Sequence, residues 1–481
     1  MKKLFISSLI ISSYLYPNPK ATLKSNASLI YHTLPSYVDN FSDIFSKGVF
    51  YGRLRFNSSA FKWDDELYKG TKWIRKDNAI GAIGGSLIYH SAYMYGVGFC
   101  VGGYVSKAKG SLDNSLAYLY KGGKDLINRY DMLHHGDNDM SIIAQSYIEY
   151  RYSKGYMQYG RVLFDSFLTK SNDTKMIPNA FEGVTYYSSD ISDTHIKLAY
   201  LTKQKLKDHT KFHHLLAYQP KTDDDKYAPY TQNDDSAMHR GLTLEKLQQK
   251  GIDDRLIVCE VDNHSIDKLD VKVNYTSVPK LISSAMIQLD YKLSYEDVTI
   301  KPAVRYMYQF DDQAGQIGGA NLKGITQGYK TPNSLDTYLV ATRLDIGYKF
   351  YKFRLGYSYV ANKGDIVAPW RGFPTSGFTR AMSQYNWYAN TKAYMLQCDI
   401  DMQKAHLFTG TKATLKYVIQ DFDDKKLGVP SDNQLITLDI FKKFEDDIYM
   451  KLRFAHSFGK SVANKLENSY SEARMEFNYL F

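Results

Sequence analysis

Ser471-Glu-Ala-Arg-Met-Glu-Phe-Asn-Tyr-Leu-Phe481 is the stretch that decides the fold of this chain. Every second residue from Ala473 to Phe481 is apolar or aromatic, and most of the residues between them are polar. A period of two indicates a β-strand with one apolar and one polar face. In a transmembrane barrel the apolar face of such a strand meets lipid and the polar face meets a wet lumen.

The start of the chain is typical of an exported protein. A basic Met1-Lys2-Lys3 precedes an apolar and hydroxylic run from Leu4 to Leu15. This run has the length of a signal-peptide core and is too short for a membrane helix. We therefore expect a signal peptide over 1–21, a lead-in segment over 22–47 and a barrel over 48–481. Past the leader no run of 18 apolar residues occurs, so no membrane helix is predicted.

Composition narrows the class without deciding it. The mean hydropathy of −0.41 is compatible with a barrel, because lipid-facing and water-facing residues alternate in its strands. The aromatic share of 15% suits interfacial girdles, but it also suits a tyrosine-rich soluble β-sandwich or lectin. The net charge of +10 indicates anionic partners, and an exported protein disfavours nucleic acid. Cys100, Cys259 and Cys398 show no paired spacing and are interpreted as packing residues.

The period-2 pattern recurs along the whole chain and predicts an all-β, up-and-down antiparallel transmembrane barrel of eighteen strands. The predicted strands are 48–57, 80–89, 94–105, 141–152, 155–163, 182–189, 194–202, 255–263, 267–276, 281–292, 297–310, 335–348, 351–361, 387–400, 405–419, 434–444, 447–457 and 471–481.

Connection lengths alternate between short and long. Short turns such as Ser153-Lys154 and Lys349-Phe350 alternate with long polar segments at 58–79, 106–140, 203–254, 311–334, 362–386 and 458–470. This alternation is expected of a barrel with short periplasmic turns and long outer loops. The last strand then closes the barrel against the first strand, near 50–57.

The face predicted to point inward carries more base than acid. Its predicted basic residues are Arg53, Arg55, Lys197, Lys272, Lys301, Arg305, Arg343, Lys352, Arg354, Lys412, Lys416, Lys451, Arg453 and Arg474. The inward acids are fewer, namely Glu149, Asp270, Asp290, Asp345, Asp439 and Glu476. Such a lumen attracts anions, because its low-dielectric wall focuses the field. Alternatively, the charges pair across strands and only keep the lumen solvated.

The segment from Gly160 to Gly183 joins the end of a strand to a polar, turn-rich stretch with its own apolar anchors. Met176, Ile177, Pro178 and Phe181 are these anchors. A loop with apolar anchors packs on a surface, and in a barrel of this size the surface available is the inner wall. We therefore expect a constriction loop near 164–181.

Gly160-Arg161, Asp165, Asp173, Met176, Pro178 and Phe181-Glu182-Gly183 resemble the third-loop segment of the OprD-type substrate-specific porins. The resemblance implies a monomeric eighteen-stranded barrel whose third and seventh loops fold inward. It also implies an arginine-rich ladder on the lumen wall that guides small carboxylates. A weaker match at 364–377 places the second inner loop near 362–386, and the long, charged loop 203–254 departs from the family pattern.

On this interpretation Arg161, Asp165, Asp173, Pro178 and Glu182 belong to the constriction loop. Its acids facing a basic wall would create a transverse field that orients a solute carrying both charges. Alternatively, these carboxylates only pin the loop to arginines such as Arg161. Phe481 is expected, from the resemblance, to be the signal that barrel-assembly machinery recognises.

The leading functional hypothesis is an outer-membrane channel for small anionic or zwitterionic solutes, namely carboxylates, amino acids or peptides. An adhesin acting through loops 106–140 and 203–254 is the alternative, and a membrane-embedded enzyme is a third. No catalytic motif, cofactor or metal is expected, since His134-His135 and His213-His214 lack the spacing of a zinc site. The expected partners are outer-membrane lipid, small solutes and barrel-assembly machinery, and we expect a monomer, with an oligomer as the alternative.

Overall fold

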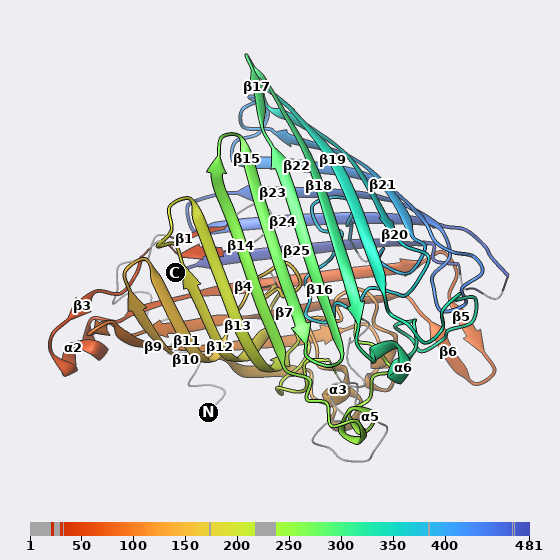
Figure 1. Cartoon of the computed structure of the whole chain (residues 1–481), viewed down its shortest axis with the longest axis horizontal. Coiled ribbons are helices and arrows are strands. Elements are labelled where there is room, and N and C mark those ends of the chain that lie inside the picture. The colour runs from red at the N-terminus through yellow and green to blue at the C-terminus, as the bar shows by residue number, and fades with distance from the viewer. Residues whose placement is uncertain are drawn as a thin grey trace.

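The structure is a computed structural model that describes residues 21–23, 29–31, 33–172, 175–216, 237–382, 385–463, 465 and 467–481. Its long strands form one closed antiparallel barrel (Figure 1). They are β4 (Val49–Trp63), β7 (Asn78–His90), β9 (Val97–Gly110), β10 (Asp139–Tyr152), β11 (Gly155–Val162), β12 (Ala180–Ser188), β13 (Thr194–Lys205), β14 (Leu256–Ile266), β15 (Leu269–Val278), β16 (Ile282–Tyr291), β18 (Val298–Asp311), β19 (Thr337–Tyr348), β20 (Tyr351–Val360), β21 (Lys392–Asp401), β22 (Thr411–Asp421), β23 (Asn433–Lys443), β24 (Ile448–Gly459) and β25 (Tyr470–Leu480).

Short strands and short helices accompany the long barrel strands. The short strands are β1 (Ala21–Leu23), β2 (Leu29–Tyr31), β3 (Tyr37–Val38), β5 (Leu67–Lys69), β6 (Lys72–Arg75), β8 (Tyr93–Met94) and β17 (Leu293–Tyr295). The helices are α2 (Phe41–Ser46), the 3₁₀ helix η1 (Asn114–Leu119), α3 (Arg129–His135), α5 (Leu244–Gln249) and α6 (Ala314–Gly318). Helices α3, α5 and α6 gather at one rim, whereas β17 extends past the opposite rim (Figure 1). No helix in the described ranges is both long and apolar enough to cross a membrane.

The last strand closes the barrel against the first long strand, as predicted. The register between β25 and β4 runs from Tyr470 opposite Trp63 to Leu480 opposite Arg53. Beyond β25 the Gly52 N–H donates to the Phe481 carbonyl at 2.9 Å, and the Phe481 N–H donates to the Gly52 carbonyl at 3.2 Å. Phe481 is therefore hydrogen-bonded into the sheet.

The predicted alternation of connections is confirmed. Two-residue turns at 153–154, 267–268 and 349–350 lie at one rim, and long loops at 163–179, 206–255 and 361–391 lie at the other. Residues 279–281 are an exception, since this connection at the loop rim is short.

Two of the predicted strands begin at the wrong residue. β21 begins at Lys392 rather than at 387, because Trp387, Tyr388 and Ala389 are buried among the inner loops. β22 begins at Thr411 rather than at 405, because 402–410 forms a turn in which Leu407 and Phe408 are exposed. In both places apolar residues that belong to a loop or turn imitate the strand period.

The two faces of the wall separate as the period predicts. In β18 the outward Tyr306 is 43% exposed, whereas the inward Arg305 is 7% exposed and Gln309 is fully buried. The barrel interior is filled by loops, whose Leu168 and Trp387 belong to the largest buried cluster. At the turn rim, Leu23 of β1 packs with Phe441, Tyr449 and Leu480.

Candidate functional site

The connection 163–179 folds against the inner wall. Phe164, Leu168, Met176 and Ile177 of this loop are fully buried, as expected for apolar anchors in a packed loop. The Ser166 N–H donates to the Thr169 carbonyl at 2.9 Å, which folds the loop into a tight turn at its inner end.

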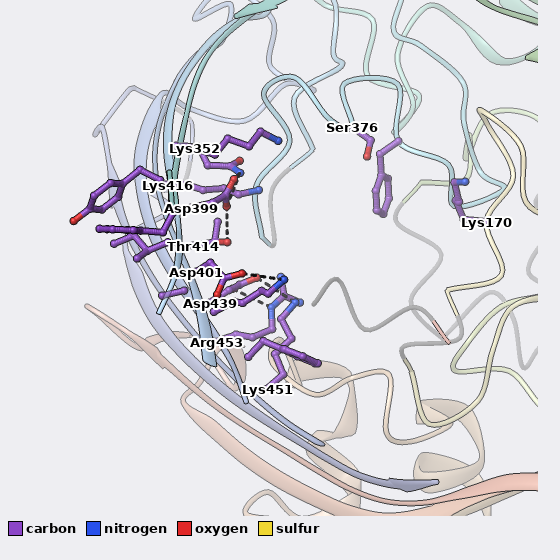
Figure 2. A pocket seen from close by; sticks show the side chains of 18 of the residues that line it. Lys170, Lys352, Ser376, Asp399, Asp401, Thr414, Lys416, Asp439, Lys451 and Arg453 are labelled. Carbon is purple, nitrogen blue, oxygen red and sulfur yellow. Dashed lines mark hydrogen bonds and ion pairs between the residues drawn. The ribbon is translucent and has the colours of Figure 1, made fainter. Parts of the chain in front are cut away.

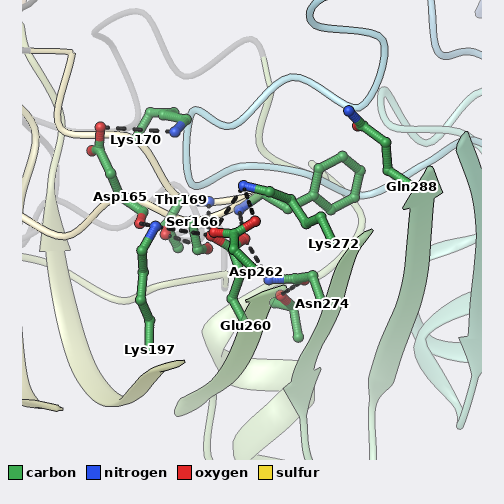
Figure 3. A network of polar contacts seen from close by, with 12 residues as sticks. Asp165, Ser166, Thr169, Lys170, Lys197, Glu260, Asp262, Lys272, Asn274 and Gln288 are labelled. Atoms are coloured by element: carbon green, nitrogen blue, oxygen red, sulfur yellow. Dashed lines mark hydrogen bonds and ion pairs between the residues drawn. The ribbon is translucent and has the colours of Figure 1, made fainter. Parts of the chain in front are cut away.

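Glu260 on β14 is the wall residue that holds this turn (Figure 3). Its buried carboxylate accepts a hydrogen bond of 2.6 Å from the Phe167 N–H and pairs with Lys197 at 3.0 Å. Asn274 donates to the same carboxylate at 3.1 Å. Lys197 also donates to the Asp165 carbonyl at 3.2 Å, so the loop and the wall share one polar network. A buried carboxylate with this many donors fixes the loop in one place.

The loop 361–391 is joined to 163–179 backbone to backbone. The Lys170 N–H donates to the Trp370 carbonyl at 3.0 Å, and the Gly372 N–H donates to the Leu168 carbonyl at 2.8 Å. These bonds form a bridge between Thr169 and Arg371. The two inner loops therefore meet as a small two-stranded ribbon, which we call the loop clasp (168–170 and 370–372).

Three arginines predicted to line the lumen contact the second loop at 374–377. Arg305 donates to the carbonyls of Pro374 at 2.6 Å and Ser376 at 3.0 Å. Arg343 and Arg354 both donate to the Gly377 carbonyl, at 3.1 and 2.8 Å. Arg343 also pairs with Asp290, and Arg354 with Asp345 at 2.7 Å. These guanidinium groups hold the loop and balance wall acids.

A cavity of about 850 Å³, the inner chamber, lies between the loops and a wall to which β15, β16, β18 and β20 to β24 contribute. It reaches the turn rim at Lys349, and Figure 2 shows part of its lining. Figure 2 shows Lys416, Asp439 and Arg453 on the wall facing Ser376 and Lys170 on the loops. The basic residues that line it are Lys170, Lys272, Arg305, Lys349, Lys352, Lys404, Lys412, Lys416, Lys451 and Arg453. The acids in its described lining are Asp399, Asp401 and Asp439.

A second cavity of about 750 Å³, the outer chamber, lies toward the long loops. Its basic lining residues are Lys121, Lys124, Lys175, Lys207, Arg240, Lys323, Arg371, Arg380, Lys416, Arg453, Lys465 and Arg474. Within the described residues, Asp439 is the one carboxylate in this lining. An imbalance of this size gives a positive local potential.

The two chambers share Asn172, Phe373, Lys416, Asp439 and Arg453, which we call the waist. Asn172 and Phe373 come from the two inner loops, and the other three come from the wall. Asp439 pairs with Lys451 at 3.3 Å and with Arg453 at 3.2 Å. Lys416 has no hydrogen bond or ion pair with any described residue, so its ammonium is available at the junction of the chambers.

Other predicted basic residues lie elsewhere in the barrel. Arg55 is buried on β4 and donates to the Lys175 carbonyl of the loop 163–179. Arg53, two residues before Arg55 on the same face of β4, is also buried. Lys301 is exposed near the turn rim and lines neither chamber. Lys352, Lys412 and Lys451 line the inner chamber, where Lys412 pairs with Asp401 at 3.5 Å.

The residues assigned to the constriction loop separate into two groups. Asp165 is on the loop and accepts from the Ser171 N–H at 2.6 Å, and the Pro178 carbonyl accepts from Lys205. Asp173 lies outside the described residues.

Arg161 and Glu182 are not on the loop. They lie on β11 and β12, on the same faces as the outward Tyr159 and Tyr186. Glu182 pairs there with Arg161 at 3.0 Å and with Lys203 at 3.2 Å, which makes the outward position tolerable for all three charges.

The sequence patterns did not indicate the bases that the loops bring to the outer chamber. Lys121, Lys175, Arg240 and Arg380 come from four separate loops with no periodicity, so only the excess of base in the long loops could have suggested them. Burial lowers the pKa of Lys175 to about 8, although Asp125 at 3.0 Å opposes this shift. Burial likewise lowers the pKa of Arg380 to about 10.

The described ranges contain no group of three or more His, Cys, Asp or Glu side chains arranged to hold a metal ion. His209 and His213 bond to each other at 2.7 Å, and His214 bonds to Asp254 at 3.2 Å. These three histidines therefore bond to groups of the loop 206–255 itself.

A closed antiparallel barrel with an apolar exterior and a lumen narrowed by two inward loops defines an outer-membrane porin. The family description "outer membrane porin, OprD family" matches residues 121–418, which is more than half of the chain. The chain therefore belongs to the OprD family of outer-membrane porins, and its location is the outer membrane.

Solved structures share the fold at low sequence identity. Acinetobacter baumannii OccAB3 has a TM-score of 0.69 and 13% identity, with 91% of this chain and 100% of OccAB3 covered. Pseudomonas aeruginosa OccK8 (OprE) has a TM-score of 0.66 and 11% identity, with 91% and 99% covered. Pseudomonas aeruginosa OpdK with vanillate has a TM-score of 0.64 and 13% identity, with 91% and 99% covered. Comparison with curated proteins gives no match.

Proposed function

We propose that this porin is a passive, partly selective channel for small anionic or zwitterionic solutes, such as carboxylates, amino acids or peptides. The observation that carries the proposal is the pair of basic chambers that share one waist. Solutes would collect in the outer chamber and pass Lys416 and Arg453 into the inner chamber. The structure of the related OpdK with vanillate, a small carboxylate, supports this solute class.

The acids and bases of the waist have separate roles in this proposal. Lys416 and Arg453 would attract the carboxylate of a solute, and Asp439 would attract an ammonium group. Asn172 and Phe373, held by the loop clasp, would set the width of the passage. In our proposal Arg305, Arg343 and Arg354 position the second loop as well as contributing to the basic field, since they donate to its carbonyls.

Planar-bilayer recording of the refolded full-length protein tests the proposal. We expect single-channel steps with a reversal potential that shows anion preference in a salt gradient. Lys416→Gln should lower the preference for anions by about fivefold, because one unit charge near contact distance in water is worth about 1 kcal/mol.

Lys301→Gln is the matched control, since it removes the same charge from a wall lysine that lines neither chamber. Its reversal potential should match that of the wild type. A wild-type channel that prefers cations, or a Lys416→Gln channel with unchanged selectivity, would contradict the proposal.

The adhesin alternative gains no support from the described part of the long loop. Leu215, Leu216, Leu242 and Leu247 in 206–255 are fully buried in the main core cluster. This part of the loop packs over the barrel instead of projecting from it. Residues 217–236 of the predicted loop 203–254 lie outside the described residues.

Assembly is a further part of the proposal. Residues 1–21 would direct export and be removed, and residues 22–47 would lead into the barrel. Phe481 would be read by barrel-assembly machinery before the seam between β25 and β4 closes. A monomer would be sufficient for this transport, because one barrel contains a complete pair of chambers.

A further inference from the structure

A groove of about 420 Å³ is cut into the outward surface of the barrel, on the side away from both chambers. It crosses β23, β24, β25 and β4, where the barrel closes. Its base is a row of residues paired across these strands, in the order Leu438, Phe454, Ala473 and Ala60. The two alanines lie opposite each other and form a low floor, and Phe454 and Leu438 form a wall beside it.

A second row, polar at three of its four positions, closes the groove toward the loop rim. It runs across the same strands in the order Ile436, His456, Ser471 and Lys62. His456 Nδ1 and Ser471 Oγ are 2.9 Å apart. Lys62 is one residue from the end of β4, so this row stands at the boundary between the apolar band and the outer loops. In an outer-membrane barrel this is the level of the outer-leaflet head groups.

The charge at this end of the groove has one sign. Lys62 is exposed and forms no ion pair with any described residue. The adjacent Glu472 faces the lumen, where it is buried and accepts from Arg474 at 2.7 Å. The outward surface therefore presents a lysine and a histidine at the end of the apolar groove, without a carboxylate in the row.

We propose that this groove binds one acyl chain of the phosphorylated glycolipid of the outer leaflet, with a lipid phosphate against Lys62 and His456. The floor and one wall of the groove give the acyl chain close van der Waals contact, and such contact drives packing within a bilayer. The polar row supplies the opposite charge for the phosphate at the level where that phosphate lies. This inference is independent of solute selectivity, because the groove and the chambers lie on opposite sides of the wall.

Native mass spectrometry of the folded full-length protein in detergent tests the proposal, with purified lipid A as the probe and phosphatidylethanolamine as the comparison lipid. The wild type should bind one lipid A per barrel in preference to phosphatidylethanolamine. Lys62→Gln should reduce lipid A occupancy by about fivefold, the effect of one unit charge near contact distance in water. Ala473→Leu fills the groove and should also reduce lipid A occupancy.

Lys109→Gln is the control, because Lys109 is another exposed lysine on β9 at the same rim and lies outside the groove. It should bind as the wild type does. Ala60→Leu is a second way to fill the groove, and a heat-dependent gel shift shows which variants are folded. No lipid A adduct on the wild type, equal binding by folded groove variants, preference for phosphatidylethanolamine, or a dimer that depends on Ala473 would each overturn the proposal.

Discussion

Lys175 is a loop residue whose charge changes with pH near neutrality. Its ammonium lines the outer chamber, and burial lowers its pKa to about 8. A lysine is charged below its pKa, so the outer chamber carries this charge at pH 6 and loses it as the pH rises through about 8. The anion preference of the channel should therefore fall between pH 7 and pH 9.

Reversal potentials measured at pH 6, 7, 8 and 9 check this expectation. Lys175→Gln should resemble the wild type at alkaline pH and should show a weaker pH dependence. Lys107→Gln is a suitable control, because Lys107 is an outward lysine paired with Asp139 at 3.5 Å. A wild-type selectivity that is constant over this range would contradict a role for Lys175.

At the scale of elements, Glu260 is the strand residue that accepts a backbone hydrogen bond from the inner loop. Glu260 of β14 accepts from the Phe167 N–H and pairs with Lys197, and its side chain is buried. Glu260→Gln keeps the size of the side chain but loses its charge. We expect it to weaken docking of the loop by about 1–3 kcal/mol, the cost of losing a charged hydrogen-bond partner in a buried place.

A loosened loop should appear as greater open-channel noise and as added conductance levels in single-channel traces. Asp262→Asn is the matched control, since Asp262 pairs with Lys272 at 2.9 Å in the same network but does not contact the loop backbone in the described contacts. If Glu260→Gln and wild-type traces are indistinguishable, Glu260 does not hold the loop in place.

At the scale of the whole molecule, Phe481 extends the seam at which the barrel closes. Phe481 adds two backbone hydrogen bonds to Gly52 beyond the end of β25. Deleting Phe481 removes both bonds and the terminal aromatic ring, so the folded fraction should fall while the conductance of assembled channels stays near the wild-type value. The folded fraction is read from the heat-dependent gel shift, with Phe481→Tyr as a control that keeps the ring. Full assembly of the shortened chain would contradict this expectation.

The strand framework could be predicted because each strand carries its own period of two. The pairing of the last strand with the first followed from the same reasoning, since a closed sheet must pair its two end strands, but the register of that pairing was not predicted. Trp387 and Leu407 misled the prediction, because an apolar residue buried by loops or placed in an interfacial turn has the same appearance in sequence as one facing lipid.

The chambers could be predicted only in part. Lys416 and Arg453 are in strands, so their inward face followed from the period. Arg380 and Lys465 reach the outer chamber through loop conformations that depend on contacts distant in sequence. Arg161 and Glu182 were assigned to the loop because they lie next to it in the sequence. The sequence does not show that they instead form an ion pair on the outward face of the strands.

The loop clasp has a consequence for engineering and for divergence within the family. Because backbone bonds join 168–170 to 370–372, the two inner loops form one structural unit, although they are distant in sequence. Grafting one loop from a relative would keep these bonds only where the new backbone follows the same path beside its partner. Exchanging both loops together would preserve the ribbon, so new solute preferences are most readily acquired when the two segments change in concert.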